Sequence, residues 1–357
     1  MNDEKEWMRL LASVTPANEA ARAASHRRWA ACAKPLGSLG LLERAIEDIA
    51  ALTGCAEIDL SRRAVLVFCA DNGVVAQGVT QTDSSVTGVV ARELAAGRTA
   101  VCKLAEIAHC AVVPVDMGIR DFPPQSGVVS RRIGNGTADI TQGPAMTRAA
   151  AVKAVLTGAD LVRAQGATLI ATGEMGIGNT TTASAVACAL LGRPAAEMTG
   201  RGAGLSDAGL ARKIRAVALA LAVNKPNPDD PLDVLAKVGG FDIAAMCGAY
   251  LGGAAFGVPV LIDGFISAVA ALCAVRLCPA AGKAMLASHV SAEPGGALVL
   301  AALGKPPFLT AGMRLGEGTG AVAAIPLLDM AAAVYADSHT FAEIELTPYT
   351  PQDGAPC

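Results

Sequence analysis

The sequence is poor in aromatic residues, which make up 3% of its 357 residues, and it lacks a strong excess of either charge. With so few Phe, Trp and Tyr, the core has to be built from Ala, Val, Leu and Ile, within a hydrophobic content of 52%. The 29 basic and 32 acidic residues give a net charge of −3. A broad nucleic-acid surface needs a basic excess on one face, so we expect no nucleic-acid partner.

Metal-binding and secretion motifs are also missing. The ten cysteines include no C-x-x-C pair, and most lie in apolar runs such as "VLVFCAD", which is typical of buried thiols in a reducing cytosol. The four histidines are scattered along the chain, so we predict no metal site and no cofactor. The N-terminus, "MNDEKEWMRLL", has no apolar signal core, which favours a cytoplasmic protein.

One uncharged stretch, residues 243–262, is long enough to cross a membrane as a helix. Four glycines and a proline interrupt it, however. We expect it to divide into a helix, "IAAMCGAYLGGAA", a glycine stop and a strand, "VPVLID". We therefore predict no membrane span.

A recurring pattern predicts the fold. Five apolar runs each end in an acidic residue close to glycine, at Asp71, Asp116, Glu174, Asp263 and Glu293, and helical segments such as "LARKIRAVALALA" lie between most of them. Short buried strands that alternate with helices predict an α/β fold, a mostly parallel sheet covered by helices on both faces. Ligands bind beyond the carboxyl ends of such strands, so we expect the five clusters to converge on one crevice. The alternative for each cluster is an ordinary tight turn.

Two glycine loops indicate a phosphate site. "GEMGIGNTTTASAVACAL" reads as a strand end, a loop and a helix that Asn179 or Thr180 is expected to cap, and such a helix end binds anions. "TGRGAGLSDAGLARK" is a second loop before a helix, which carries Lys213. Neither loop has the spacing of a Walker motif or a dinucleotide fingerprint, so the pair suits a phosphate monoester. Ordinary helix caps are the alternative.

A third glycine-rich stretch, "RLGEGTGA", carries the carboxylate of Glu317 among three glycines. Glycines let a flat ring approach the backbone closely, and a carboxylate beside it can act as a general base. The alternative is a structural glutamate that forms an ion pair with Arg314. For Glu174 the alternatives are a role in catalysis and a turn acid that caps a backbone N–H.

Nine segments occur in the order of a known family. They are "KPLGSLGLLE", "ADNGV", "GTADITQGPAMT", "GEMGIGNTT", "TGRGAGL", "VGGFDIAAMCGAYL", "DGFISAVAAL", "SHVSAEPGG" and "MRLGEGTGA". Together, from about Lys34 to Leu328, they resemble the nicotinate-nucleotide–dimethylbenzimidazole phosphoribosyltransferases. The resemblance implies a Rossmann-like large domain, a small helical domain built from both chain ends, and a homodimer. We assign residues 1–57 and 328–357 to the small domain and 58–327 to the large domain.

The resemblance also implies the reaction and the site. The family transfers the 5-phosphoribosyl group of nicotinate mononucleotide to a benzimidazole-type base, without a metal, in the assembly of the cobamide nucleotide loop; the products are an α-ribazole 5′-phosphate and nicotinate. The catalytic base falls on Glu317, and Glu174 is the second acid, to bind the ribose hydroxyls or stabilise the positive charge that develops on the ribosyl ring. The implied substrate-binding residues are Thr80, Gly88, Met175, Gly176, Ile177, Gly178, Asn179, Thr180, Gly202, Lys213, Asp263, Gly264, Ser291, Leu315 and Gly316.

The segment that lines the aromatic-base pocket in the family departs from the family pattern here. Asn72 replaces a histidine, Thr80 a serine, Thr82–Asp83 a Tyr-Pro pair and Gly88 a glutamine. Ribosyl transfer is therefore expected, whereas the acceptor base stays open. The alternatives are a paralogue that ribosylates a purine or a phenol, and a catalytically silent homologue that binds nucleotides.

Overall fold

The chain folds around one parallel sheet. A computed structural model describes residues 2–350. Within them, six parallel strands run in the order β3-β2-β1-β4-β5-β6. The strands are β1 (Arg63–Ala70), β2 (Ala111–Gly118), β3 (Val129–Ser130), β4 (Leu169–Met175), β5 (Val260–Ile262) and β6 (Met285–Ala287). This is the strand order of doubly wound nucleotide-binding sheets, so the Rossmann-like α/β prediction is confirmed.

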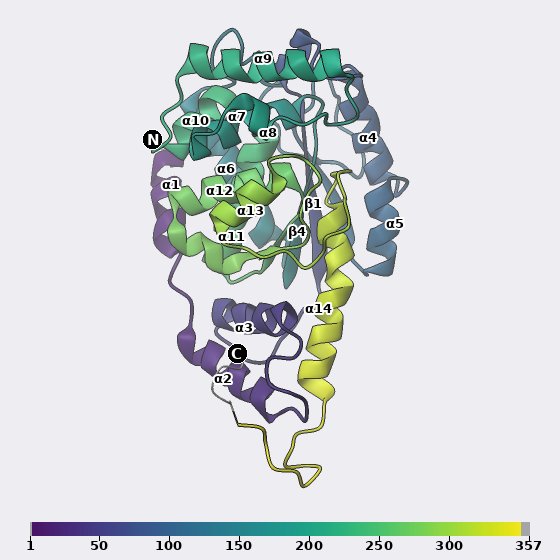
Figure 1. Ribbon diagram of the computed structural model, residues 1–357. Helices are drawn as coiled ribbons and strands as arrows, with labels where there is room; N and C mark the ends of the chain where they lie inside the picture. Colours follow the sequence, from purple (N-terminus) through teal and green to yellow (C-terminus); the bar gives the residue numbers. More distant parts are fainter. Residues whose placement is uncertain (1, 351–357) are drawn as a thin grey trace.

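Helices cover both faces of the sheet (Figure 1). One face carries α1 (Asn2–Ser13), α6 (Arg148–Gln165), α7 (Asn179–Leu191), α9 (Asp207–Asn224), α10 (Pro231–Val238), α11 (Phe241–Phe256), α12 (Phe265–Leu277) and α13 (Gly296–Leu303). The other face carries α3 (Leu41–Thr53), α4 (Ser85–Ala95), α5 (Ala100–Ile107) and α14 (Thr319–Asp337).

Strand β1 explains why both faces are apolar. Leu66 and Phe68 point into the core on the α6 and α11 side, and Val65 and Val67 point into the core on the α3 and α14 side. All four side chains are fully buried. Because successive side chains of a strand face opposite sides, a strand covered on both sides reads as an unbroken apolar run.

The uncharged stretch at residues 243–262 divides as expected. Helix α11 ends at Gly257, which has a left-handed conformation, and β5 follows. Among the described residues, only α14 has the length and apolar composition that a membrane-spanning helix requires, and half of that stretch is buried inside the fold. Core helices of globular proteins meet the same criterion.

The elements near the chain ends form two groups (Figure 1). Helices α2 (Glu19–Ala31) and α3 lie beside the lower half of α14, where the rings of Trp29 and Tyr335 pack edge to face with centroids 5.0 Å apart. Helix α1 instead packs against the large layer, and its Trp7 and Leu10 belong to the core that contains α6 and α11. The small domain of residues 1–57 and 328–357 stays a prediction, and residues 351–357 lie outside the described part of the chain.

Candidate functional site

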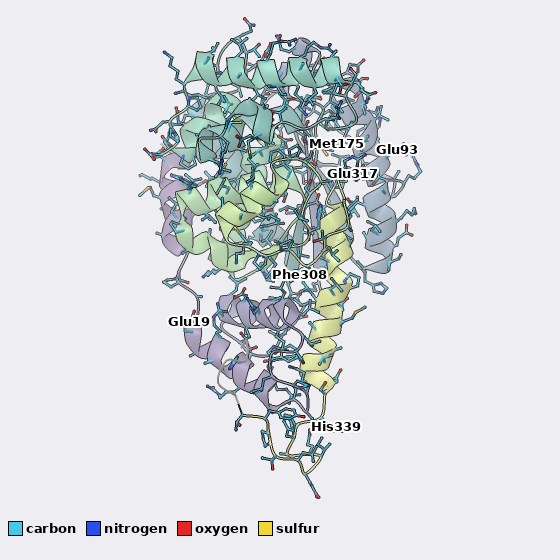
Figure 2. All side chains as sticks on the ribbon, in the orientation of Figure 1. Glu19, Glu93, Met175, Phe308, Glu317 and His339 are labelled. Atoms are coloured by element: carbon cyan, nitrogen blue, oxygen red, sulfur yellow. The ribbon has the colours of Figure 1, made fainter. Side chains whose placement is uncertain are left out.

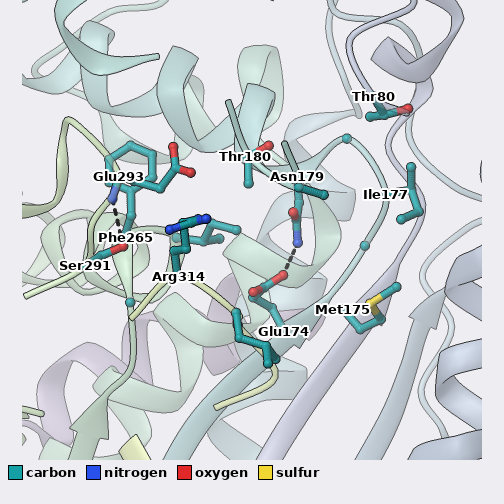
Figure 3. Close-up of a pocket in the computed structure, with 18 of the residues that line it drawn as sticks. Thr80, Glu174, Met175, Ile177, Asn179, Thr180, Phe265, Ser291, Glu293 and Arg314 are labelled. Carbon is teal, nitrogen blue, oxygen red and sulfur yellow. Dashed lines mark hydrogen bonds between the residues drawn. The ribbon is translucent and has the colours of Figure 1, made fainter. Parts of the chain in front are cut away.

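A pocket opens at the carboxyl edge of the sheet, where β1, β4, β5 and β6 end (Figure 3). All but one of the site residues predicted from the sequence line it. They are Thr80, Glu174, Met175, Gly176, Ile177, Gly178, Asn179, Thr180, Gly202, Lys213, Asp263, Gly264, Ser291, Leu315, Gly316 and Glu317. The fold thus brings together segments that are more than 200 residues apart in the sequence.

Only three of the five acidic strand ends reach this pocket: Glu174, Asp263 and Glu293. The expectation that all five converge was therefore wrong. Asp71 is buried, where it accepts hydrogen bonds from the Thr87 hydroxyl at 2.6 Å and from a backbone N–H at 2.7 Å. Asp116 forms an ion pair with Arg132 at 2.8 Å. Local partners hold these two carboxylates away from the cavity.

Glu174 is the second-last residue of strand β4 and is buried at the base of the pocket. The amide nitrogen of Asn179 donates to Glu174 Oε2 (Figure 3). It also donates, at 3.1 Å, to Oδ2 of Asp242, a fully buried residue of α11 that we did not predict. Burial, and then the nearby charge of Asp242, raise the pKa of Glu174 to about 8. Glu174 therefore holds a proton near neutral pH while the pocket has no ligand.

The first turn of α7 and the buried Lys213 form the polar end of the pocket. Lys213 Nζ donates to Thr180 Oγ1 at 2.7 Å, and burial lowers the pKa of this lysine to about 8. A Cβ atom on Gly202 would lie 3.2 Å from Lys213 Nζ, so the glycine lets the second loop approach closely. A cation, a hydroxyl and the positive end of a helix dipole thus lie around one space, an arrangement that suits an anion.

The predicted cap of α7 was wrong. The residue before the helix is Gly178, in a left-handed conformation, and no side chain caps the helix start. The Asn179 amide is used by the two carboxylates, and the Thr180 hydroxyl accepts from Lys213. Both side chains that could have capped α7 are thus engaged elsewhere. The N–H groups of Asn179, Thr181 and Thr182 donate to the carbonyls of Gly176 and Gly178 instead.

Glu317 lies on a loop just before α14 and is half-buried (Figure 2). Its backbone N–H donates to the carbonyl of Glu174 at 3.2 Å, so the two acids are held on touching segments. Its carboxylate accepts one long hydrogen bond, 3.5 Å, from the N–H of Val101 at the start of α5. Among the described residues, no ion pair joins Glu317 to Arg314. The arrangement favours a reactive glutamate over a structural one.

Asp263 follows β5 and borders the pocket with 3% of its surface exposed. Its carboxylate accepts backbone N–H groups from Gly318, Gly320 and Ala321 at 3.2, 2.7 and 3.0 Å. Burial raises the pKa of Asp263, which the nearby His289 opposes. Most of its hydrogen-bonding capacity is therefore used by the protein itself.

Gly88 is the one predicted residue that does not line the pocket. It is buried in α4, where a Cβ atom would lie 3.0 Å from Cδ2 of Phe122. The neighbouring Thr87 hydroxyl accepts the N–H of Ile177 at 3.1 Å, which ties α4 to the first glycine loop. The structure therefore does not bring position 88 together with the other predicted contacts.

Several pocket residues were not predicted from the sequence as contacts, among them Phe265, Ile266, His289 and Arg314. Phe265 and Ile266 begin α12, directly after the predicted pair Asp263 and Gly264. Their place next to a strand end was the only available signal.

Comparison with known proteins gives consistent matches. A family model described as "Phosphoribosyltransferase" matches residues 14–346. The chain is 47% identical to a nicotinate-nucleotide–dimethylbenzimidazole phosphoribosyltransferase of Ruminiclostridium cellulolyticum over 89% of this chain and 91% of that protein. It is 47% identical to the protein of the same name from Chloroflexus aggregans, over 92% and 95%. The solved structure of CobT from Thermus thermophilus superposes with a TM-score of 0.87 at 42% identity, over 92% of this chain and 99% of that one.

Proposed function

Because the chain belongs to this phosphoribosyltransferase family, we propose that it transfers the 5-phosphoribosyl group of nicotinate mononucleotide to dimethylbenzimidazole. The products are α-ribazole 5′-phosphate and nicotinate, for the nucleotide loop of a cobamide. The observation that carries this proposal is the convergence of an anion site and two carboxylates, Glu174 and Glu317, in one pocket.

The nucleotide phosphate binds at Lys213 and Thr180, beside the positive end of the α7 dipole. The hydrogen bond between Lys213 and Thr180 already directs the ammonium group toward this space. The ribose then lies over Glu174 and Asn179. A cationic pyridinium nearby favours the anionic form of Glu174, since an opposite charge within about 4–6 Å lowers the pKa of a carboxyl group. Glu174 stabilises the positive charge on the ribosyl ring as the bond to nicotinate lengthens.

Glu317 acts on the acceptor. A ring nitrogen of dimethylbenzimidazole forms the new bond to C1′, while the bond from C1′ to the pyridinium nitrogen breaks and leaves its electron pair on nicotinate. The leaving group departs as a neutral pyridine ring and needs no acid. The proton on the second ring nitrogen of the acceptor passes to the Glu317 carboxylate, which prevents a cationic product.

The test is an incubation of the purified protein with nicotinate mononucleotide and a panel of aromatic bases, read by mass spectrometry. We expect α-ribazole 5′-phosphate and free nicotinate in equal amounts. Ribosylation only of a purine or a phenol would favour the paralogue, and no product with any base would favour the silent homologue.

The acceptor range is a finer proposal. Thr82 stands where the family pattern has a tyrosine, and it lines the pocket, so the large ring of the family is missing there. We propose that plain benzimidazole competes with dimethylbenzimidazole within about tenfold to a hundredfold, the range that a missing apolar contact allows. Equimolar competition is the measurement. A preference for dimethylbenzimidazole above roughly a thousandfold would contradict a relaxed pocket.

We also propose a cytoplasmic homodimer, which rests on the family resemblance. Light scattering at micromolar concentration should give twice the chain mass of 35.9 kDa. A particle of the single-chain mass would contradict the dimer, and recovery of the protein in the membrane fraction of its own cells would contradict the location.

A further inference from the structure

The loop that carries Glu317 has an unusual backbone. Gly316, Glu317 and Gly318 are successive residues with φ values of 91°, 61° and 87°. Glycine adopts such left-handed conformations freely, but glutamate does not, because its Cβ approaches the carbonyl oxygen. The position of Glu317 therefore depends on contacts that hold the loop in this shape.

Two strand ends hold the loop. On the β4 side, the Glu317 N–H donates to the Glu174 carbonyl, and Gly173 packs so closely that a Cβ there would lie 2.5 Å from the Glu317 carbonyl group. On the β5 side, Asp263 accepts hydrogen bonds from the backbone where the loop passes into the first turn of α14. It accepts the N–H groups of Gly318, Gly320 and Ala321.

Resting on the function proposed above, we propose that Asp263 is a positioning residue for Glu317 and that it does not act as a contact for the nucleotide. It fixes the turn that follows Glu317 and so aims the carboxylate at the acceptor base. The two carboxylate oxygens have different partners. Oδ1 accepts the N–H groups of Gly320 and Ala321, and Oδ2 accepts the N–H of Gly318, the residue adjacent to Glu317.

The near absence of exposed surface supports this role over ligand binding. Asp263 is 3% exposed, and three donors already point at its two oxygens. A carboxylate has roughly four acceptor positions, so these donors leave little capacity for a ribose hydroxyl. Glu174 shows the contrast, because its carboxylate receives a single amide donor, from Asn179.

The substitution Asp263→Asn tests the proposal. Asparagine can keep its carbonyl oxygen toward Gly320 and Ala321, which places its NH₂ group against the N–H of Gly318, two donors facing each other. A displacement of about 1 Å at a catalytic group can lower turnover about a hundredfold. We expect kcat to fall about tenfold to a hundredfold, while KM for nicotinate mononucleotide stays within about threefold of that of the wild type.

A second variant reaches the same turn without altering Asp263. In Gly320→Ala the new Cβ would lie 2.0 Å from Nδ1 of His289, so the turn has to shift. We expect the same fall in kcat with KM preserved. The control is Thr147→Ala, which removes the side chain that accepts the Ala150 N–H at the start of α6, away from the pocket, and should leave kcat unchanged.

The outcomes separate the alternatives. A tenfold or greater rise in KM for the nucleotide at unchanged kcat in Asp263→Asn would show a substrate contact and overturn the proposal. A lower melting temperature with wild-type kcat and KM would show a cap with no positioning role and would also overturn it. Failure of the proposed function itself is distinguishable, since the wild-type protein would then form no α-ribazole 5′-phosphate.

Discussion

The two acids of the pocket have the same functional group in very different surroundings. Glu174 is the second-last residue of a buried strand, is clamped by Asn179 and shares its surroundings with other buried acids. Glu317 lies half-buried on a left-handed glycine loop, where its carboxylate accepts one long hydrogen bond. Burial raises the pKa of Glu174 to about 8, whereas Glu317 borders the pocket with a single weak partner. These different surroundings are the reason that we propose two different tasks for the two carboxylates.

The largest expected effect is on Glu317. In Glu317→Gln the side chain keeps its size but cannot accept the acceptor's proton, so kcat should fall about 10²–10⁴-fold while both substrates still bind. Steady-state kinetics and calorimetric titration are the measurements. Glu106→Gln, an exposed glutamate of α5, is the matched control and should be fully active. Near-normal turnover of Glu317→Gln with the wild-type pH profile would end the general-base assignment.

The raised pKa of Glu174 should make the unfolding free energy of the protein depend on pH. Its pKa in the folded protein, about 8, lies above its ordinary value of 4.5, so the stability that its protonated form contributes is present below pH 4.5 and is lost as pH rises through 8. Glutamine mimics the protonated form at every pH. Relative to the wild type, Glu174→Gln should therefore gain up to roughly 4 kcal/mol in unfolding free energy between pH 5 and pH 8.

Denaturant unfolding at both pH values measures this effect, with Glu197→Gln on the short helix α8 (Ala195–Met198) as the exposed control. An equal stability difference between Glu174→Gln and the wild type at pH 5 and pH 8 would mean that Glu174 is ionised throughout. The two acids would then not differ in the way their surroundings indicate.

Lys213 is the cationic counterpart of the two acids, Glu174 and Glu317, in the same pocket. Lys213→Ala should weaken nicotinate mononucleotide binding by about 1.5–3 kcal/mol, the size of a lost charge-assisted hydrogen bond, and leave dimethylbenzimidazole binding nearly unchanged. Calorimetric titration is the measurement, and Lys153→Ala on the exposed face of α6 is the control. Unaltered nucleotide affinity would remove Lys213 from the phosphate site.

The smallest effect concerns Gly316, where the two acids meet. A Cβ there would lie 2.6 Å from Oε1 of Glu174, and the alanine would have to adopt the left-handed backbone conformation of this glycine. Gly312 is also left-handed, but a Cβ there meets nothing within 4 Å. Both alanine variants should lose about 1–2 kcal/mol of stability from the backbone. Only Gly316→Ala should also lower kcat, by a few fold, and equal kinetics of the two would show that this contact is not used.

The sequence predicted the parts of this site that lie within one segment. The glycine loop after Met175, Lys213 on its helix and Glu317 among glycines were all readable from local patterns, and the alternation of strands and helices predicted the sheet. Local pattern failed where the deciding contact is distant. The hydrogen bonds from Gly320 to Asp263 cross 57 residues, and Asn179 was expected to cap its helix because its bond to Asp242 was not foreseeable.

The departures near position 88 illustrate the same limit. Gly88 replaces a glutamine of the family pattern, which predicted an opening in the base pocket. The structure instead packs Phe122 from the loop after β2 against this glycine. No local signal in the sequence shows that an aromatic ring 34 residues away fills that space.

Helix α14 carries the loop of Glu317 at one end and packs against α2 and α3 at the other (Figure 1). With 19 residues it is about 28 Å long, so a tilt of five degrees about its far end would move its first turn by roughly 2.5 Å. The orientation of α14 therefore decides where Glu317 lies. Two contacts hold this orientation, the ion pair between Arg63 and Asp329 and the ring contact between Trp29 and Tyr335. Substitutions that weaken these two contacts, far from any substrate, should displace the Glu317 carboxylate and lower kcat before they lower substrate affinity.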